Sequence, residues 1–171
     1  MILPKVRDPR FITIRRGGTL TDAHHHLLGL WAAECSEHVL PFFEQEQPQD
    51  ARPRQAIKAA RAWVRGELPM MEARRLAFGA NAAASPLAGA ARFAAYSAGQ
   101  TAAVGHVAAH YLGAAAYAIK AVGASLPEAK RDAAQRKECA WQRKRIPAEL
   151  RELVLDDQRR RNALCWSVFD P

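Results

Sequence analysis

The chain has 171 residues, of which 49% are hydrophobic, 8% aromatic and 25% charged. This composition excludes wholesale disorder, and the length is that of one compact domain. The 25 Lys and Arg residues outnumber the 17 Asp and Glu residues and give a formal net charge of +8. The excess is spread over two mixed-charge regions, so it does not form a concentrated basic arm.

Cysteine usage and the N-terminal residues predict the compartment. The three cysteines form neither a CxxC pair nor an even disulfide framework, which favours reduced thiols. The N-terminus is charged within its first five residues and lacks the apolar run of a signal peptide. Residues 93–119 carry no Lys, Arg, Asp or Glu, but they are rich in Ala and Gly, which favours a buried helix over a membrane span. We therefore expect a cytoplasmic protein without membrane contact.

The first 20 residues predict an N-terminal arm followed by a long helix. Residues 11–14 alternate weakly, but a single strand would have no partner. The long helix is predicted to start at Thr21 or Asp22, and Pro41 is expected to kink or end it. The three consecutive histidines at 24–26 fan out around a helix, so we expect a surface tract there.

Proline, glycine and capping residues mark the next two helices. Asp50 is expected to precede a second helix that has Pro53 in its first turn and Gly66 after its end. Pro69 is expected to open a third helix that runs to about Ala84.

A fourth helix is predicted from Ser85 as N-cap and Pro86 as the first helical residue. It reaches about Val122, either as one continuous helix or as a pair of helices broken near Gly99.

Two more helices complete the predicted fold. Ser125 and Glu128 have capping-box spacing, so a fifth helix is expected to run from there toward Arg145, with an inner side made by Ala133, the Arg136 stem, Ala140 and Trp141. Pro147 starts a sixth helix, whose apolar stripe is Leu150, Leu153, Val154 and Leu164. We therefore predict an all-α fold, with a short arm at 1–20 and a single-domain bundle of about six helices at 21–171.

A polar stripe on the predicted fourth helix is the first candidate site. If that helix is continuous, a group of donors and aromatic side chains falls within roughly a third of its circumference: Arg92, Tyr96, Gln100, His106, His110 and Tyr117. The stripe has no carboxylate and would suit an acidic or phosphate-bearing partner. The competing interpretation is a purely structural one, in which these groups face solvent or bond to backbone carbonyls.

Other classes of site are weakly indicated. We predict no enzyme and no cofactor, because there is no nucleophile with its base, no paired carboxylates in an apolar setting and no phosphate loop. His106 and His110 are four residues apart and could share a metal ion, but two ligands do not complete a site. The basic runs at 143–145 and 159–161 have acidic residues or a proline beside them, which favours solvated helix faces. A small basic helical protein that binds nucleic acid or a metal is the alternative function.

A series of landmarks along the chain resembles a known family. In chain order they are Trp31 with Cys35, Phe43 and Glu44, Pro48, residues 50–57, Ala62 and Trp63, Gly66, residues 98–100, His106, His110, residues 116–118, Trp141 and Gln142, Ile146 and Pro147, and Leu150 with Arg151. Over about residues 20–155 this pattern resembles the all-helical immunity proteins found beside toxins in bacterial polymorphic toxin systems. The resemblance implies a cytosolic protein that binds a cognate toxin and neutralises it by stoichiometric occlusion, without catalysis.

Seven polar or large residues without an evident core role are the expected partner contacts: Arg52, Arg54, Arg92, Tyr96, Gln100, His106 and His110. Arg52 and Arg54 lie in the first turn of the second helix, where a cation opposes the helix dipole. Trp31, Trp63 and Trp141 are instead expected in the core. The basic chain favours an acidic face on the toxin, which argues against a nuclease whose basic site is covered by an acidic inhibitor.

Overall fold

A computed structural model describes residues 2–170, and within them the chain forms seven α-helices. The helices are α1 (Asp22–Glu46), α2 (Arg52–Val64), α3 (Met70–Ala84), α4 (Gly89–Ala103), α5 (His110–Ala124), α6 (Glu128–Lys144) and α7 (Arg151–Arg161). In this part of the chain the only β pairing is an isolated bridge between Thr13 and Leu20. The predicted all-α fold is confirmed.

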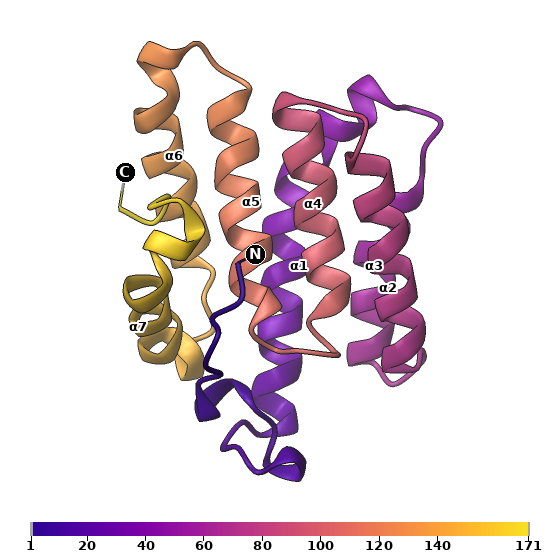
Figure 1. The fold of residues 1–171 in the computed structure, drawn as a ribbon, viewed down its shortest axis with the longest axis vertical. Helices are drawn as coiled ribbons and strands as arrows, with labels where there is room; N and C mark the ends of the chain where they lie inside the picture. Colours follow the sequence, from indigo (N-terminus) through magenta and orange to yellow (C-terminus); the bar gives the residue numbers. More distant parts are fainter. Residues whose placement is uncertain (1, 171) are drawn as a thin grey trace.

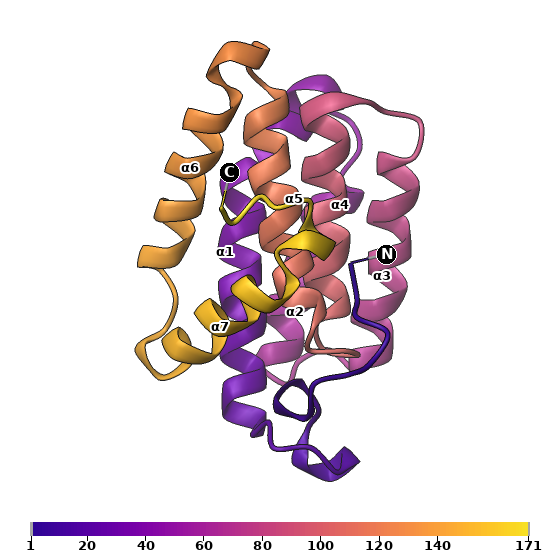
Figure 2. The ribbon, with the colours of Figure 1, turned by 60° about the vertical axis from the view of Figure 1, so that its left-hand side comes forward.

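The helices form two layers. Figures 1 and 2 show α6, α5, α4 and α3 side by side, with α1 and α2 behind them. α1 packs against α2, α4 and α5. Its largest buried side chains, Trp31 and Phe43, share one core with Tyr111 and Ile119 of α5. The many buried alanines of α4 and α5 let these helices pack closely.

Buried hydroxyl groups join the central helices. Ser36 Oγ of α1 lies 2.6 Å from Ser97 Oγ and 2.7 Å from Thr101 Oγ1, both on α4. Ser97 donates onward to the carbonyl oxygen of Ala114, and Thr101 donates to that of Ala32. Each buried hydroxyl therefore has a partner, so the network fixes α4 between α1 and α5 without leaving an unpaired polar group.

The N-terminal arm packs against the bundle. Phe11 and Leu20 are buried, and the Phe11 ring stacks on Tyr111 with centroids 5.4 Å apart. Arg10 Nη1 lies 2.8 Å from Asp156 Oδ2 of α7. The arm is thereby held against α5 and α7, which both lie far from it in the sequence.

A buried ion pair fixes α7 and the turn between α4 and α5. The Asp157 carboxylate accepts hydrogen bonds from the Tyr111 hydroxyl at 2.7 Å and from the Arg161 guanidinium at 2.6 and 2.9 Å. Arg161 also donates to the carbonyl oxygen of Ala109 at 3.1 Å, just before α5 begins. All three side chains are buried. The Asp157 carboxylate offsets the charge of the Arg161 guanidinium and accepts the hydrogen bond of the Tyr111 hydroxyl.

Several predicted helix boundaries hold. Thr21 is the N-cap of α1, since its hydroxyl accepts the His24 N–H. Pro69 immediately precedes α3, and Gly66, with a φ of +74°, follows α2. Pro41 was expected to kink or end α1, and the structure shows that it does not end the helix. The helix continues to Glu46, because Phe43 in the following turn is fully buried in the core.

The predicted start of the fourth helix is also wrong. Ser85 is the C-cap of α3, where its N–H bonds to the carbonyl oxygen of Asn81. A tight turn follows, and α4 begins only at Gly89, whose φ of +59° changes the chain direction.

The fourth element is a pair of helices, but the break is not at Gly99. Gly99 lies inside α4, where a Cβ atom would collide with Asn81 of α3, so its role is close helix packing. The break lies at residues 104–109, around Gly105.

The predicted capping box does not form. Ser125 ends α5, with its hydroxyl donating to the carbonyl oxygen of Val122, and α6 begins at Glu128. The expected inner positions Ala133 and Ala140 are exposed. The buried residues of α6 are instead Glu138, Cys139 and Gln142, and Gln142 donates to the carbonyl oxygen of Ala115 and to the Glu138 carboxylate.

The last helix is shorter than predicted. A 3-10 turn, Ala148–Leu150, follows Pro147, and α7 then ends at Arg161. Leu164 lies beyond α7 and is exposed, so it is not part of an apolar helix stripe. No helix within residues 2–170 has both the length and the hydropathy that a membrane span needs.

Candidate binding face

The break between α4 and α5 separates the residues of the predicted polar stripe into three groups. Arg92 and Tyr96 of α4 meet Tyr117 of α5, while Gln100 meets His110, and His106 lies in the turn. One continuous stripe was expected only if the helix was unbroken, and the break removes that condition.

The first of these groups belongs to a surface cluster that we call the aromatic-cation patch. It consists of Arg92, Phe93, Tyr96, Tyr117, Lys120 and Trp166. The Tyr117 ring is central: its centroid lies 5.0 Å from that of Trp166, 5.3 Å from Tyr96 and 6.2 Å from Phe93. These spacings are those of favourable aromatic pairs.

Both cations of the patch lie over aromatic rings. Lys120 Nζ is 4.1 Å from the Trp166 ring centroid and 4.7 Å from that of Phe93, and burial lowers the pKa of Lys120. The Arg92 guanidinium lies 5.5 Å from the Tyr96 ring centroid. Within residues 2–170, neither cation forms an ion pair with a carboxylate. Both charges are available to an acidic partner.

The position of Trp166 depends on an unusual turn. Trp166 and Ser167 have φ values of 57° and 58°, in the left-handed region that bulky residues rarely adopt. Asn162 holds the turn, because its carbonyl oxygen accepts the Ser167 N–H and its side-chain oxygen accepts the Phe169 N–H. The indole remains 45% exposed. Sequence reasoning missed Trp166, since it lies outside any helical pattern.

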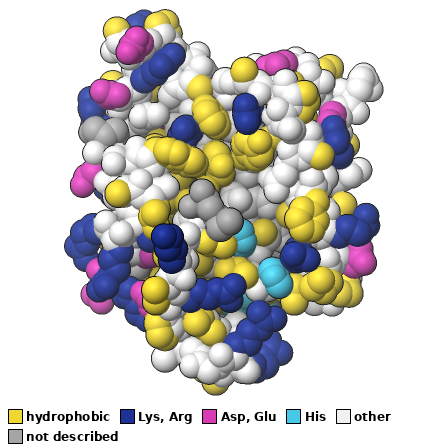
Figure 3. All heavy atoms as spheres, viewed as in Figure 1, with side chains coloured by type: hydrophobic (Ala, Val, Ile, Leu, Met, Phe, Trp, Pro, Cys, Tyr) yellow, Lys and Arg dark blue, Asp and Glu magenta, His cyan; other side chains and the backbone are white. Residues whose placement is uncertain are grey.

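The same face carries a second feature. Figure 3 shows hydrophobic side chains gathered across the middle of the face, over α4 and α5, with histidine, lysine and arginine side chains below them. The lower region surrounds a pocket of about 990 Å³ that we call the arm pocket. Its walls come from the N-terminal arm, the start of α1, the turn between α4 and α5, α7, and the side chains of Trp63, Met70 and Leu164.

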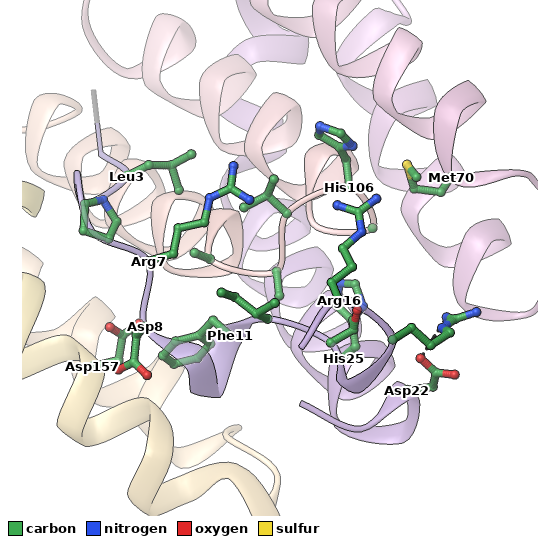
Figure 4. A pocket seen from close by; sticks show the side chains of 18 of the residues that line it. Leu3, Arg7, Asp8, Phe11, Arg16, Asp22, His25, Met70, His106 and Asp157 are labelled. Atoms are coloured by element: carbon green, nitrogen blue, oxygen red, sulfur yellow. Dashed lines mark hydrogen bonds and ion pairs between the residues drawn. The ribbon is translucent and has the colours of Figure 1, made fainter. Parts of the chain in front are cut away.

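Some of the cations around the arm pocket form ion pairs with its carboxylates, and others do not. Its three carboxylates each have an arginine partner in the pairs Asp8 with Arg10, Asp22 with Arg15, and Asp157 with Arg161. Lys5, Arg7 and Arg16 also line the pocket, and within the described chain none of them has an ion-pair partner. Figure 4 shows the Arg7 and Arg16 guanidinium groups directed toward the side of the pocket where His106 lies.

Three histidines border this pocket. Nδ1 of His106 is buried without a hydrogen-bond partner, and burial followed by the charges of nearby arginines lowers the pKa of His106. His25 was expected in a surface tract but is buried, and its Nε2 lies 2.8 Å from the Val104 carbonyl oxygen. The rings of His25 and His26 lie edge-on to Trp63, at 4.9 and 5.0 Å.

His110 takes part in a separate contact. Its Nδ1 lies 2.8 Å from Oε1 of Gln100 and donates to it. Burial lowers the pKa of His110 to about 4, with smaller contributions from the charges of His106 and Arg161. Across residues 2–170, no three His, Cys, Asp or Glu side chains gather as metal ligands.

The remaining expected contacts lie elsewhere. Arg52 and Arg54 are exposed on α2, where they form forked ion pairs with Asp50 and Glu44. These pairs offset the unfavourable position of two cations at the start of a helix.

The basic run at the end of α7 is also paired. Arg159 and Arg160 bond to Asp156, and Arg161 is the buried partner of Asp157. This part of α7 therefore offers few free cations for a phosphate backbone.

Only one of the three tryptophans expected in the core is fully buried. Trp31 lies in the core, where its indole N–H donates to the carbonyl oxygen of Gln142. Trp63 is half-buried in a wall of the arm pocket. Trp141 is half-buried between His38 and Arg145, each 3.8 Å from its ring. The expectation is wrong for these two, because an indole can pack on one face and remain open on the other.

Comparison with known proteins identifies a family. Residues 18–149 match the model of a family described as Imm-5 like putative immunity protein. Neither the curated proteins nor the solved structures gave a match. The matched range takes in α1 to α6, and thus most of the aromatic-cation patch and the turn that carries His106. The chain therefore belongs to the Imm-5-like immunity protein family.

Proposed function

We propose that this protein binds a cognate toxin and neutralises it by stoichiometric occlusion, without catalysis, in the cytoplasm. Membership of the Imm-5-like family supports a toxin as the partner. The observation that carries the location of the interface is the aromatic-cation patch, a partly exposed cluster in which Trp166 packs beside Tyr and Arg side chains of α4 and α5.

The chemistry of the patch suits a protein partner. Tyr, Trp and Arg are enriched at interface centres, where a few anchors contribute most of the binding free energy. Trp166 is already seated on Tyr117, so binding requires little further ordering of these rings. Of the seven residues expected from the sequence, Arg92 and Tyr96 belong to the patch, and our proposal centres on them.

The charge of the patch predicts the partner's surface. Residues 85–127 contain no Asp or Glu, so both helices of the patch present only neutral and positive side chains. An acidic surface on the toxin would complement Arg92 and Lys120 and would speed association. This complementarity argues against a toxin whose active site is a basic nucleic-acid groove.

Co-expression tests the partnership itself. We would express this chain with the product of the adjacent gene and score the rescue of growth and one-to-one co-purification. Rescue with a stable complex is expected. A toxic neighbour that is neither neutralised nor bound would refute neutralisation of that toxin.

Substitutions then test the interface. Trp166→Ala and Arg92→Ala should each weaken the complex by about 30-fold or more, the effect of losing an anchor of roughly 2 kcal/mol. Trp141→Ala is the matched control, because Trp141 is also a half-open indole beside an arginine but lies on α6. It should leave affinity unchanged. Equal affinities for Trp166→Ala and the unmodified protein would move the interface away from the patch.

A further inference from the structure

We infer that the arm pocket is a binding site for a small anion with a ring-bearing apolar body. This inference goes beyond toxin neutralisation, because the arm pocket and the aromatic-cation patch are different features of the face. It rests on the shape of the cavity, on its unpaired cations and on an unpartnered histidine nitrogen.

The pocket has the size and lining of a small-molecule site. Its volume of about 990 Å³ accommodates a molecule with several rings. Apolar side chains make much of its wall: Phe11, Ile12, Trp63, Met70, Val107 and Leu164. The Trp63 ring is braced edge-on by His25 and His26, which gives a flat ligand a rigid surface to pack on.

The charge of the pocket selects for an anion. Each carboxylate in the lining is already bonded to an arginine, so these acids do not neutralise the remaining cations. The arm contributes Lys5, Arg7 and Arg16, and none of them pairs with a carboxylate of residues 2–170. Two guanidinium groups beside one apolar cavity fit a carboxylate, sulfonate or phosphate group, which each can bind through paired N–H donors.

His106 supplies a further polar contact. Its ring lies where the Arg7 and Arg16 side chains are directed (Figure 4), and its Nδ1 has no hydrogen-bond partner although it is buried. An unpaired buried nitrogen is unfavourable, and a small rotation of the ring on binding would let Nδ1 donate a hydrogen bond to a ligand oxygen. The anionic group would thus contact both the arm and the turn between α4 and α5.

Binding at this place would also hold the arm to the bundle. The arm is now anchored by the Phe11 ring on Tyr111 and by the ion pair between Arg10 and Asp156. An anion between the arm cations and His106 would add a third anchor. The ligand would therefore protect the arm from proteolysis.

A pair of dyes that differ by one charge tests the site. The probe is 8-anilino-1-naphthalenesulfonate, and its neutral counterpart is N-phenyl-1-naphthylamine, which has the same rings without the sulfonate. At neutral pH we expect one sulfonate dye to bind per chain, at least about tenfold more tightly than the neutral dye. Fluorescence titration and calorimetry give the affinity and the stoichiometry.

Variants place the dye in the pocket. Arg7→Gln and Arg16→Gln should each weaken sulfonate binding about tenfold and leave the neutral dye unchanged. Arg75→Gln is the matched control, since Arg75 is exposed on α3 and outside the pocket lining. Val107→Trp should fill the cavity and abolish binding of both dyes. Urea unfolding of each variant separates loss of the site from loss of the fold.

The inference would be overturned by any of three results. They are no binding of the sulfonate dye up to about 1 mM, equal affinity for the two dyes, or unchanged sulfonate affinity in the double variant Arg7→Gln/Arg16→Gln. Trp166→Ala should bind the dye normally, so failure at the pocket and failure at the toxin interface are distinguished.

Discussion

The substitution Asp157→Ala would test the buried ion pair between α7 and the turn that precedes α5. In the folded chain the carboxylate of Asp157 accepts hydrogen bonds from Tyr111 and Arg161, and all three side chains are buried. Removal of the carboxylate leaves the Arg161 charge uncompensated inside the protein and removes the acceptor of the Tyr111 hydroxyl. Breaking a buried pair in this way destabilises a protein by about 3–5 kcal/mol.

Thermal and urea unfolding measure this loss. For a chain of this length each kcal/mol lowers the melting temperature by about 2–4 °C, so a fall of roughly 6–20 °C is expected. Asp132→Ala is the control, because Asp132 is exposed on α6 and should change stability by no more than about 0.5 kcal/mol. The double variant Asp157→Ala/Arg161→Met lacks both charges. Its loss of unfolding free energy should be smaller than the sum of the losses in the two single variants.

Two outcomes would refute this account of the pair. One is a loss below about 1 kcal/mol for Asp157→Ala, which would mean that water solvates Arg161 in the variant. The other is additivity in the double variant, which would mean that the two side chains contribute independently.

Two further predictions concern His110 and two glycines. Burial lowers the pKa of His110 to about 4, below the unfolded value of about 6.5, so the unfolded chain binds the extra proton between these values and stability falls as pH drops from about 6.5 to about 4. Urea midpoints near pH 7.5 and pH 5 should therefore differ less in His110→Gln than in the unmodified protein. An equal difference would show that His110 is not the source of the pH dependence. Gly105→Ala should destabilise by about 1–3 kcal/mol, because the new Cβ would lie 2.9 Å from the Trp63 ring. Gly79→Ala, inside α3 with no atom closer than 3.9 Å, should stabilise by about 0.5–1 kcal/mol in the same urea assay, and the same sign for both glycines would refute the packing argument.

Helix positions could be predicted where local chemistry decides them. Thr21 caps α1 with its own side chain, and Pro69 and Gly66 act through their backbone preferences, so neighbouring residues in the sequence carried the information. Ser85 and Ser125 have the same local chemistry but end the preceding helices. A serine can bond in either direction, and tertiary packing decides which helix it serves.

The break between α4 and α5 was expected, as one of two alternatives, near Gly99, and it was misplaced because its cause lies in another helix. Position 105 requires glycine because the Trp63 ring of α2 lies against it. Position 99 requires glycine because Asn81 of α3 lies against it. In the sequence both are isolated glycines in an alanine-rich stretch. Only the three-dimensional packing distinguishes a turn from a close helix contact.

The candidate sites were predictable only in part. Arg92 and Tyr96 were selected because a stripe without carboxylates is unusual on a helix, and that composition survives the break. The arm pocket was not predictable, since its walls come from residues 3–16, 22–26, 63, 70, 105–109 and 157–164. Such distant segments carry no shared spacing that periodicity could detect.

The docking of the arm has a consequence for biosynthesis. The arm is translated first, yet its anchors are Tyr111 of α5 and Asp156 of α7, which leave the ribosome much later. Because α1 to α4 emerge before α5 and α7, they can begin to associate while the arm still has no surface to occupy. The arm pocket therefore closes only after α7 has emerged, and a nascent chain stalled before α7 would leave the arm open to proteases.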